Sequence, residues 1–126
     1  MSLNAPAATP AELSTLDLGR SIVETASDRQ AIDVRLLDLR ELIAFADHFV
    51  VCHGTSDRHV RAIVDAIVES IGKLGYEPTH IEGTPEGGWI LIDYGQIIVH
   101  VFAEEQREYY QLERLWQLAP VLMRVQ

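Results

Sequence analysis

The 126-residue chain has one cysteine and no long hydrophobic segment, and each shortage excludes a class of protein. Cys52 cannot form a disulfide within the chain, so we expect a reducing compartment, the cytoplasm, and a buried thiol. No apolar run approaches the roughly 18 residues that span a bilayer, so we expect no association with a membrane. The opening stretch MSLNAPAATP lacks the basic, apolar and small-residue order of a signal peptide.

Basic residues are also scarce, since 10 Lys and Arg stand against 19 Asp and Glu, a formal net charge of −9. Such a domain repels phosphate backbones, and the sequence has no basic stripe, so we expect no direct binding to nucleic acid. An acidic face could instead speed association with a basic protein. The alternative is that the charge only keeps the protein soluble, and composition alone favours this alternative.

Hydrophobic periodicity predicts one α/β domain with a small mixed β-sheet flanked by helices. Helices are predicted from the capping box Thr9–Glu12 to Arg29, along the apolar stripe Val60–Ile71, and over Glu104–Leu118. Strands are predicted over residues 32–36, 48–54, 78–82, 89–93 and 97–102. The strand–helix–strand passage at 48–82 indicates a right-handed crossover between parallel strands. We assign residues 1–8 to a loose tail, 9–119 to the domain and 120–126 to a C-terminal tail.

The residue types that bind metals or act as nucleophiles occur without the spacing that such sites need. The loose cluster of potential metal ligands comprises Asp47, His48, His53, Asp57 and His59. It contains no HExxH or CxxC, and His48 and His53 should point to opposite sides of one strand. Nothing places a base beside Cys52, although His53 and His100 are conceivable partners. We therefore expect no metal, no cofactor and no catalytic residues.

The turn Gly54–Ser56 follows a strand and opens a helix, so its N–H groups and hydroxyls could meet a phosphate. Nucleotidyltransferases combine a small turn at this place with paired carboxylates that hold magnesium. Here Asp33 and Asp38 are five residues apart and face opposite ways, and Asp93 has no acidic residue two positions away. A structural helix cap is the favoured interpretation. A nucleotide-binding module or nucleotidyltransferase-type enzyme is the alternative.

The most unusual surface feature is the stretch GGWILIDYGQIIVHVF at Gly87–Phe102, where a tryptophan opens an apolar run with an aspartate at its centre. Strand alternation places Trp89, Leu91 and Asp93 on one face, and the residues between them, with Tyr94, on the other. If the other face packs on helices, the first face has the composition of a protein-binding hot spot. The alternative, in which helices cover both faces and Asp93 only serves the turn, is about equally favoured by the pattern.

Four segments of the chain resemble, in order and spacing, the ribosomal silencing factor family, also called the RsfS or Iojap family. They are Asp47–Ile67, Ile81–Gly83, Trp89–Phe102 and Arg107–Trp116. The resemblance implies a non-enzymatic protein whose fold is related to nucleotidyltransferases but lacks their catalytic carboxylates. It also implies binding to the large ribosomal subunit through its basic protein fourteen. The bound protein would block joining of the small subunit and lower translation when nutrients are scarce.

The same resemblance implies which residues contact the ribosomal protein, because the family's partner-binding segment matches Trp89–Gly95. Trp89 is implied as the apolar anchor, with Leu91 and Tyr94 widening the contact. Asp93 is implied to pair with a basic side chain of the partner. A homodimer of the free protein through the exposed hairpin face could coexist with this role, and the sequence leaves that question open.

Overall fold

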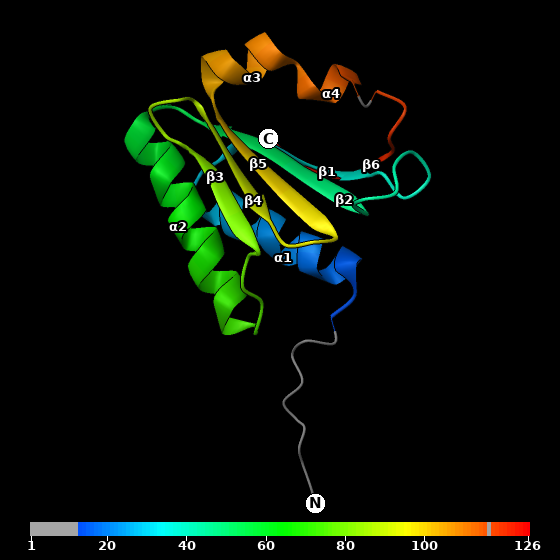
Figure 1. The fold of residues 1–126 in the computed structure, drawn as a ribbon. Helices are drawn as coiled ribbons and strands as arrows, with labels where there is room; N and C mark the ends of the chain where they lie inside the picture. Colours follow the sequence, from blue (N-terminus) through cyan, green and yellow to red (C-terminus); the bar gives the residue numbers. More distant parts are fainter. Residues whose placement is uncertain (1–12, 116) are drawn as a thin grey trace, which may run out of the picture.

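The computed structural model describes residues 13–115 and 117–126, which form a mixed six-stranded sheet with helices on both faces (Figure 1). The strands are β1 Ile32–Asp38, β2 His48–Gly54, β3 His80–Thr84, β4 Trp89–Asp93, β5 Ile97–Ala103 and β6 Val121–Val125. The helices are α1 Thr15–Asp28, α2 Asp57–Lys73, α3 Glu104–Tyr110 and the short α4 Leu112–Leu115. The predicted α/β class and the mixed sheet flanked by helices are therefore confirmed.

The strands lie in the order β3-β4-β5-β2-β1-β6, and β2 and β5 are the parallel neighbours among otherwise antiparallel pairs. The pairings make β2 and β3 run in the same direction, as the predicted crossover requires. The two strands are not adjacent, however, because β4 and β5 lie between them. The Trp89–Phe102 segment forms the predicted hairpin.

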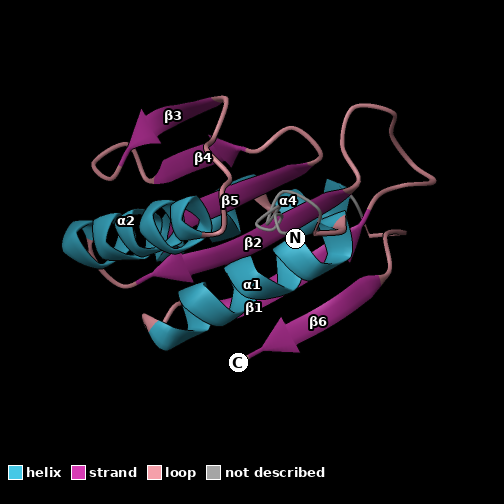
Figure 2. Ribbon diagram, turned by 90° about the horizontal axis from the view of Figure 1, so that it is seen from below, coloured by secondary structure: helices cyan, strands magenta, loops and turns pink. Residues whose placement is uncertain are grey.

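Helices α1 and α2 cover one face of the sheet and lie against each other (Figure 2). Each has a continuous apolar stripe, and in α2 the buried residues include Val60, Ile63 and Ile67. Ser14 and Ser56 cap the two helices, because their hydroxyls accept hydrogen bonds from backbone N–H groups inside the first turn. Thus α1 begins at Thr15, and the predicted tail 1–8 and capping box Thr9–Glu12 lie outside the described residues. None of the described helices is long and apolar enough to cross a bilayer.

The second face is covered at its centre by α3, which packs on β5 and β2, whereas β3 at the edge is exposed along its length. The predicted single helix over Glu104–Leu118 is wrong at Gln111, whose left-handed conformation (φ 50°) ends α3. This break is an ordinary helix terminus, in which the Gln111 N–H donates to the carbonyl of Arg107. Tyr109, which the helical period places on the same side as Leu112, is exposed, whereas Arg107 is the buried residue of α3.

Residues Val121–Val125, predicted to lie in the C-terminal tail, form β6 instead and pair antiparallel with β1. The prediction failed because a short strand after a proline has no helical or alternating pattern long enough to identify it. Its physical role is to cover the edge of β1, whose backbone groups would otherwise face solvent.

Candidate protein-binding site

The hairpin places Trp89, Leu91 and Asp93 on the second face of the sheet, as strand alternation predicts. The residues between them, Ile90 and Ile92, are buried in the core under α1 and α2. The register pairs each of the three with a residue of the edge strand, namely Thr84, Glu82 and His80 in that order. Directly paired residues share a face. The outer part of this face is therefore a two-strand surface beside α3.

Trp89 is half-buried and held in place by other rings. Its ring centroid lies 4.9 Å from that of Phe102, 5.9 Å from that of His100 and 4.7 Å from that of Tyr110 in α3. The indole N–H donates a hydrogen bond of 3.2 Å to Nδ1 of His100. Because its polar atom is already satisfied, the side chain presents an apolar surface in a fixed orientation. An aromatic residue ordered in advance suits binding, since little side-chain entropy remains to be lost.

Beside Trp89 lies a shallow groove of about 250 Å³, lined by Glu82, Gly83, Trp89 and Leu91. Gly83 has a φ of 93°, and a Cβ at this position would collide with the carbonyl oxygen of Trp89. Glycine thus lets the edge strand approach β4 closely and keeps the groove open. The groove has apolar walls and one carboxylate. It can accept an apolar side chain, or the aliphatic stem of a basic one.

Asp93 has a structural role as well as a place on this face. Its Oδ1 accepts a 2.7 Å hydrogen bond from the N–H of Gly95, which fixes the β4–β5 turn. Its Oδ2 lies 3.6 Å from Nδ1 of His80, and Nε2 of His80 lies 2.9 Å from the Glu82 carboxylate. His80 therefore lies between two carboxylates at the rim of the face. A basic side chain from a partner would compete with it for them.

Tyr94 lies on the opposite side of the sheet, where it packs against the core cluster under α1 and α2. Burial raises the pKa of its hydroxyl to about 12, and the hydroxyl has no hydrogen-bond partner among the described residues. The resemblance implied that Tyr94 shares one surface with Trp89 and Leu91. In the structure it does not, because Tyr94 lies on the other face of the sheet. The residue supports the hairpin from beneath.

Glu82, His80 and Tyr110 belong to this surface, and sequence reasoning did not select them. No single segment could have revealed them, because their placement depends on the β3–β4 register and on where α3 crosses the sheet. The segment Ile81–Gly83 enters the sequence-based prediction only through the family resemblance.

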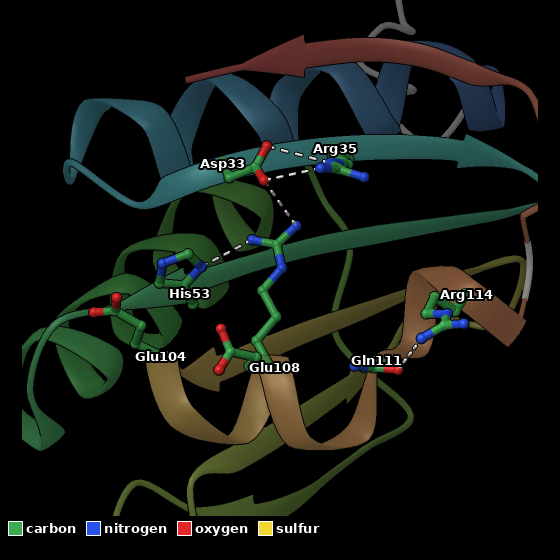
Figure 3. Close-up of a pocket in the computed structure, with 8 residues that line it drawn as sticks. Asp33, Arg35, His53, Glu104, Glu108, Gln111 and Arg114 are labelled. Atoms are coloured by element: carbon green, nitrogen blue, oxygen red, sulfur yellow. Dashed lines mark hydrogen bonds and ion pairs between the residues drawn. The ribbon is translucent and has the colours of Figure 1, made fainter.

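A second, charged cleft of about 310 Å³ lies between α3 and the strands (Figure 3). Its lining residues are Asp33, Arg35, His53, Glu104, Arg107, Glu108, Gln111 and Arg114. The buried Arg107 guanidinium donates to the carbonyl of Ile32 at 3.1 Å and lies 2.9 Å from Nδ1 of His53. It also lies 3.7 Å from the carboxylate of Asp33. These contacts fasten α3 to the sheet, so the Arg107 charge serves the fold.

Asp33 is the centre of this charge network, and its backbone has a φ of 50°. Its carboxylate accepts hydrogen bonds from Arg35 at 3.0 Å and from Arg124 of β6 at 2.8 Å. Burial works to raise the pKa of Asp33, but these two hydrogen bonds and the nearby Arg107 charge outweigh it and lower the pKa to about 2. One carboxylate thus ties together β1, β6 and α3.

In the Gly54–Ser56 turn, the groups that could bind a phosphate already form hydrogen bonds with His59. The Thr55 N–H donates to Nδ1 of His59 at 2.9 Å, and Nε2 of His59 donates to the carbonyl of Arg29 at 2.9 Å. The Ser56 hydroxyl accepts from the His59 N–H at 3.0 Å, as the predicted helix cap. A phosphate would have to displace these bonds. This observation weighs against the nucleotide-binding alternative.

The other candidate chemical groups are engaged or inaccessible. Asp38 accepts from Arg40 at 2.7 Å, and Cys52 is fully buried as expected, which raises its thiol pKa to about 12. Residues 13–115 and 117–126 contain no group of three or more His, Cys, Asp or Glu side chains placed to hold a metal ion.

The chain is similar to several known proteins, most of the curated relatives being ribosomal silencing factors. A family model described as "Ribosomal silencing factor during starvation" matches residues 12–126. Ribosomal silencing factor RsfS of Bacillus subtilis is 39% identical over 106 residues, which cover 81% of this chain and 90% of the relative. The mouse protein named "Mitochondrial assembly of ribosomal large subunit protein 1" is 32% identical over 77% of this chain and 44% of its own length. A crystal structure from Bacillus halodurans, 33% identical, superposes with a TM-score of 0.76 over 86% of this chain and 99% of that one.

Proposed function

The chain belongs to the ribosomal silencing factor family, and on that premise we propose that it binds the large ribosomal subunit and prevents the small subunit from joining it. Translation would fall as a result when nutrients are scarce. Silencing of this kind is a steric effect and requires no chemical step. The cytoplasm, where subunits join, is the proposed location.

We propose that the contact is made with the basic protein fourteen of the large subunit. The observation that carries this proposal is the open surface around Trp89, where a fixed aromatic ring, a groove and the Glu82 carboxylate lie together. An aromatic anchor beside a polar group is the usual composition of an interface hot spot. The net charge of −9 would favour encounter with a basic protein.

Within this surface the roles divide by position. Trp89 supplies the anchor, and Leu91 extends the apolar contact along the groove. Glu82 and Asp93 are the proposed acceptors for basic side chains, with His80 between them. Tyr94 is left out, because it lies beneath the sheet. The pairing of free copies through the same surface is compatible with this role, and binding to the subunit would then separate them.

The experiment is co-sedimentation of the purified protein with isolated large and small subunits. We expect binding to the large subunit alone, and loss of that binding in Trp89→Ala. Truncation of a central anchor typically costs about 2 kcal/mol or more of binding energy. The matched control is Phe45→Ala, which removes another exposed ring, from the β1–β2 loop. Full binding by Trp89→Ala would refute the site, and binding to neither subunit would refute the function.

A further inference from the structure

Two tyrosines of α3 continue the aromatic surface of Trp89 towards solvent. The ring of Tyr110 lies 4.7 Å from that of Trp89, and Tyr109 meets Tyr110 edge-on, at 5.1 Å and 83°. Exposure increases outwards along this series, from 44% for Tyr110 to 78% for Tyr109. The three rings form a continuous strip that begins at the groove and ends on the outer side of α3.

Tyr109 is not needed to attach α3 to the sheet. The helix is fastened instead by Arg107, whose guanidinium reaches Ile32, His53 and Asp33 on the inner side. The Gln106 side chain packs over Gly88, at the β3–β4 turn. An exposed ring on a helix that is held by other residues is free to contact a partner.

The exposed charges of α3 are all acidic. Glu104, Glu105 and Glu108 are exposed, although Glu104 and Glu108 also line the charged cleft, whereas Arg107, the cation of this helix, is turned inwards and buried. Glu105 precedes Tyr109 by four residues, a spacing that places the two side chains next to each other on a helix. A tyrosine ring beside a carboxylate suits a guanidinium, which can stack on the ring and hydrogen-bond to the acid.

We infer that α3 is a second arm of the partner-binding surface, in which Tyr109 and Glu105 hold an arginine of the same basic protein that covers Trp89. This inference rests on the proposed function, because it names how that partner is recognised. Two features of this surface indicate that the partner is the same basic protein. The arm is continuous with the Trp89 groove, and its charge is opposite to that of a basic protein. The apolar anchor supplies affinity, and the tyrosine–glutamate pair selects for arginine.

The test measures the dissociation constant for isolated large subunits. Tyr109→Ala should weaken binding by about tenfold, and Tyr109→Phe should bind like the wild type, because the ring is kept. Tyr109→Leu keeps an apolar side chain without a ring and should weaken binding as much as Tyr109→Ala does. Glu105→Gln should slow association and flatten its dependence on salt. Phe45→Ala, which removes a ring that is 63% exposed elsewhere, should bind normally.

Each other outcome overturns the inference in a distinct way. Full binding by Tyr109→Ala, with binding lost in Trp89→Ala, would remove the second arm and leave the proposed function intact. Full binding by Tyr109→Leu would show a hydrophobic contact and no arginine site. If Tyr109→Ala changes the self-association of the free protein in analytical ultracentrifugation but not subunit binding, the occupant is a second copy. If the wild type binds no subunit, the proposed function fails and the inference fails with it.

Discussion

The buried histidine under Trp89 makes the stability of this protein sensitive to mild acid. His100 is 4% exposed, packs against Phe49 with ring centroids 4.6 Å apart, and accepts the indole N–H of Trp89 at Nδ1. Burial lowers its pKa from 6.5 to about 4. Its Nε2 has no hydrogen-bond partner among the residues that the structure describes. A proton on Nδ1 would break the bond that orients Trp89.

The sign and size of the effect follow from the lowered pKa. Between pH 6.5 and pH 4 the unfolded chain binds a proton at His100 that the folded protein does not, so acid favours unfolding. The stabilisation is complete above this window and is lost as the pH falls through it. Lowering the pH from 7 to 5 should therefore reduce the free energy of unfolding by about 2 kcal/mol through this residue alone. That is a large part of a typical total of about 5–15 kcal/mol.

The assay is urea unfolding followed by circular dichroism at pH 7 and pH 5, for the wild type and for His100→Asn. Asparagine can place an acceptor near the position of Nδ1 but does not titrate. The variant should be less stable than the wild type at pH 7. Between pH 7 and pH 5 its free energy of unfolding should fall by about 2 kcal/mol less than that of the wild type. Burial also lowers the pKa of His48, which affects both proteins and so cancels. Parallel pH dependence of the two proteins would refute the reasoning.

Four further substitutions test the fold by the same urea unfolding. Arg107→Met removes the hydrogen bonds that fasten α3 and should cost about 3 kcal/mol; a cost below about 1 kcal/mol would mean that α3 is held by other contacts. Gly83→Ala and Gly95→Ala change glycines of nearly equal φ, 93° and 92°, but only the first meets backbone atoms. We expect Gly83→Ala to lower the free energy of unfolding by about 3 kcal/mol and Gly95→Ala to lower it by about 1 kcal/mol. Equal losses would show that the Cβ at position 83 does not collide with the backbone of Trp89. Ser56→Ala should cost about 1 kcal/mol by removing the α2 cap, and no change would mean that the hydroxyl contributes nothing there.

Local pattern predicted those parts of the site that depend on one element at a time. Trp89, Leu91 and Asp93 share a face whatever strands lie beside them, because alternation is a property of the single strand. The Ser56 cap and the α2 stripe are local in the same sense. The place of Glu82 and His80 depends on register with another strand. That register follows from the turn and from Gly83, which no periodicity specifies.

The charged and aromatic parts of α3 could not be predicted, because they result from several elements at once. Asp33 is held by arginines from β1, β6 and α3, which are far apart in the sequence. The outward position of Tyr109 follows from the packing of α3 through Arg107, which contacts Ile32 and His53 on other elements. The family resemblance implied that Trp89–Gly95 is the partner-binding segment, but it did not show that Tyr94 lies on the other side of the sheet.

We propose that this protein acts by keeping the two ribosomal subunits apart. The most direct measurement mixes isolated large and small subunits with increasing amounts of the protein and follows the joined particles by sucrose-gradient sedimentation. We expect that joined particles decrease in proportion to occupied large subunits, and that Trp89→Ala has no such effect. Recovery of the bound protein within joined particles, at an undiminished yield, would contradict it.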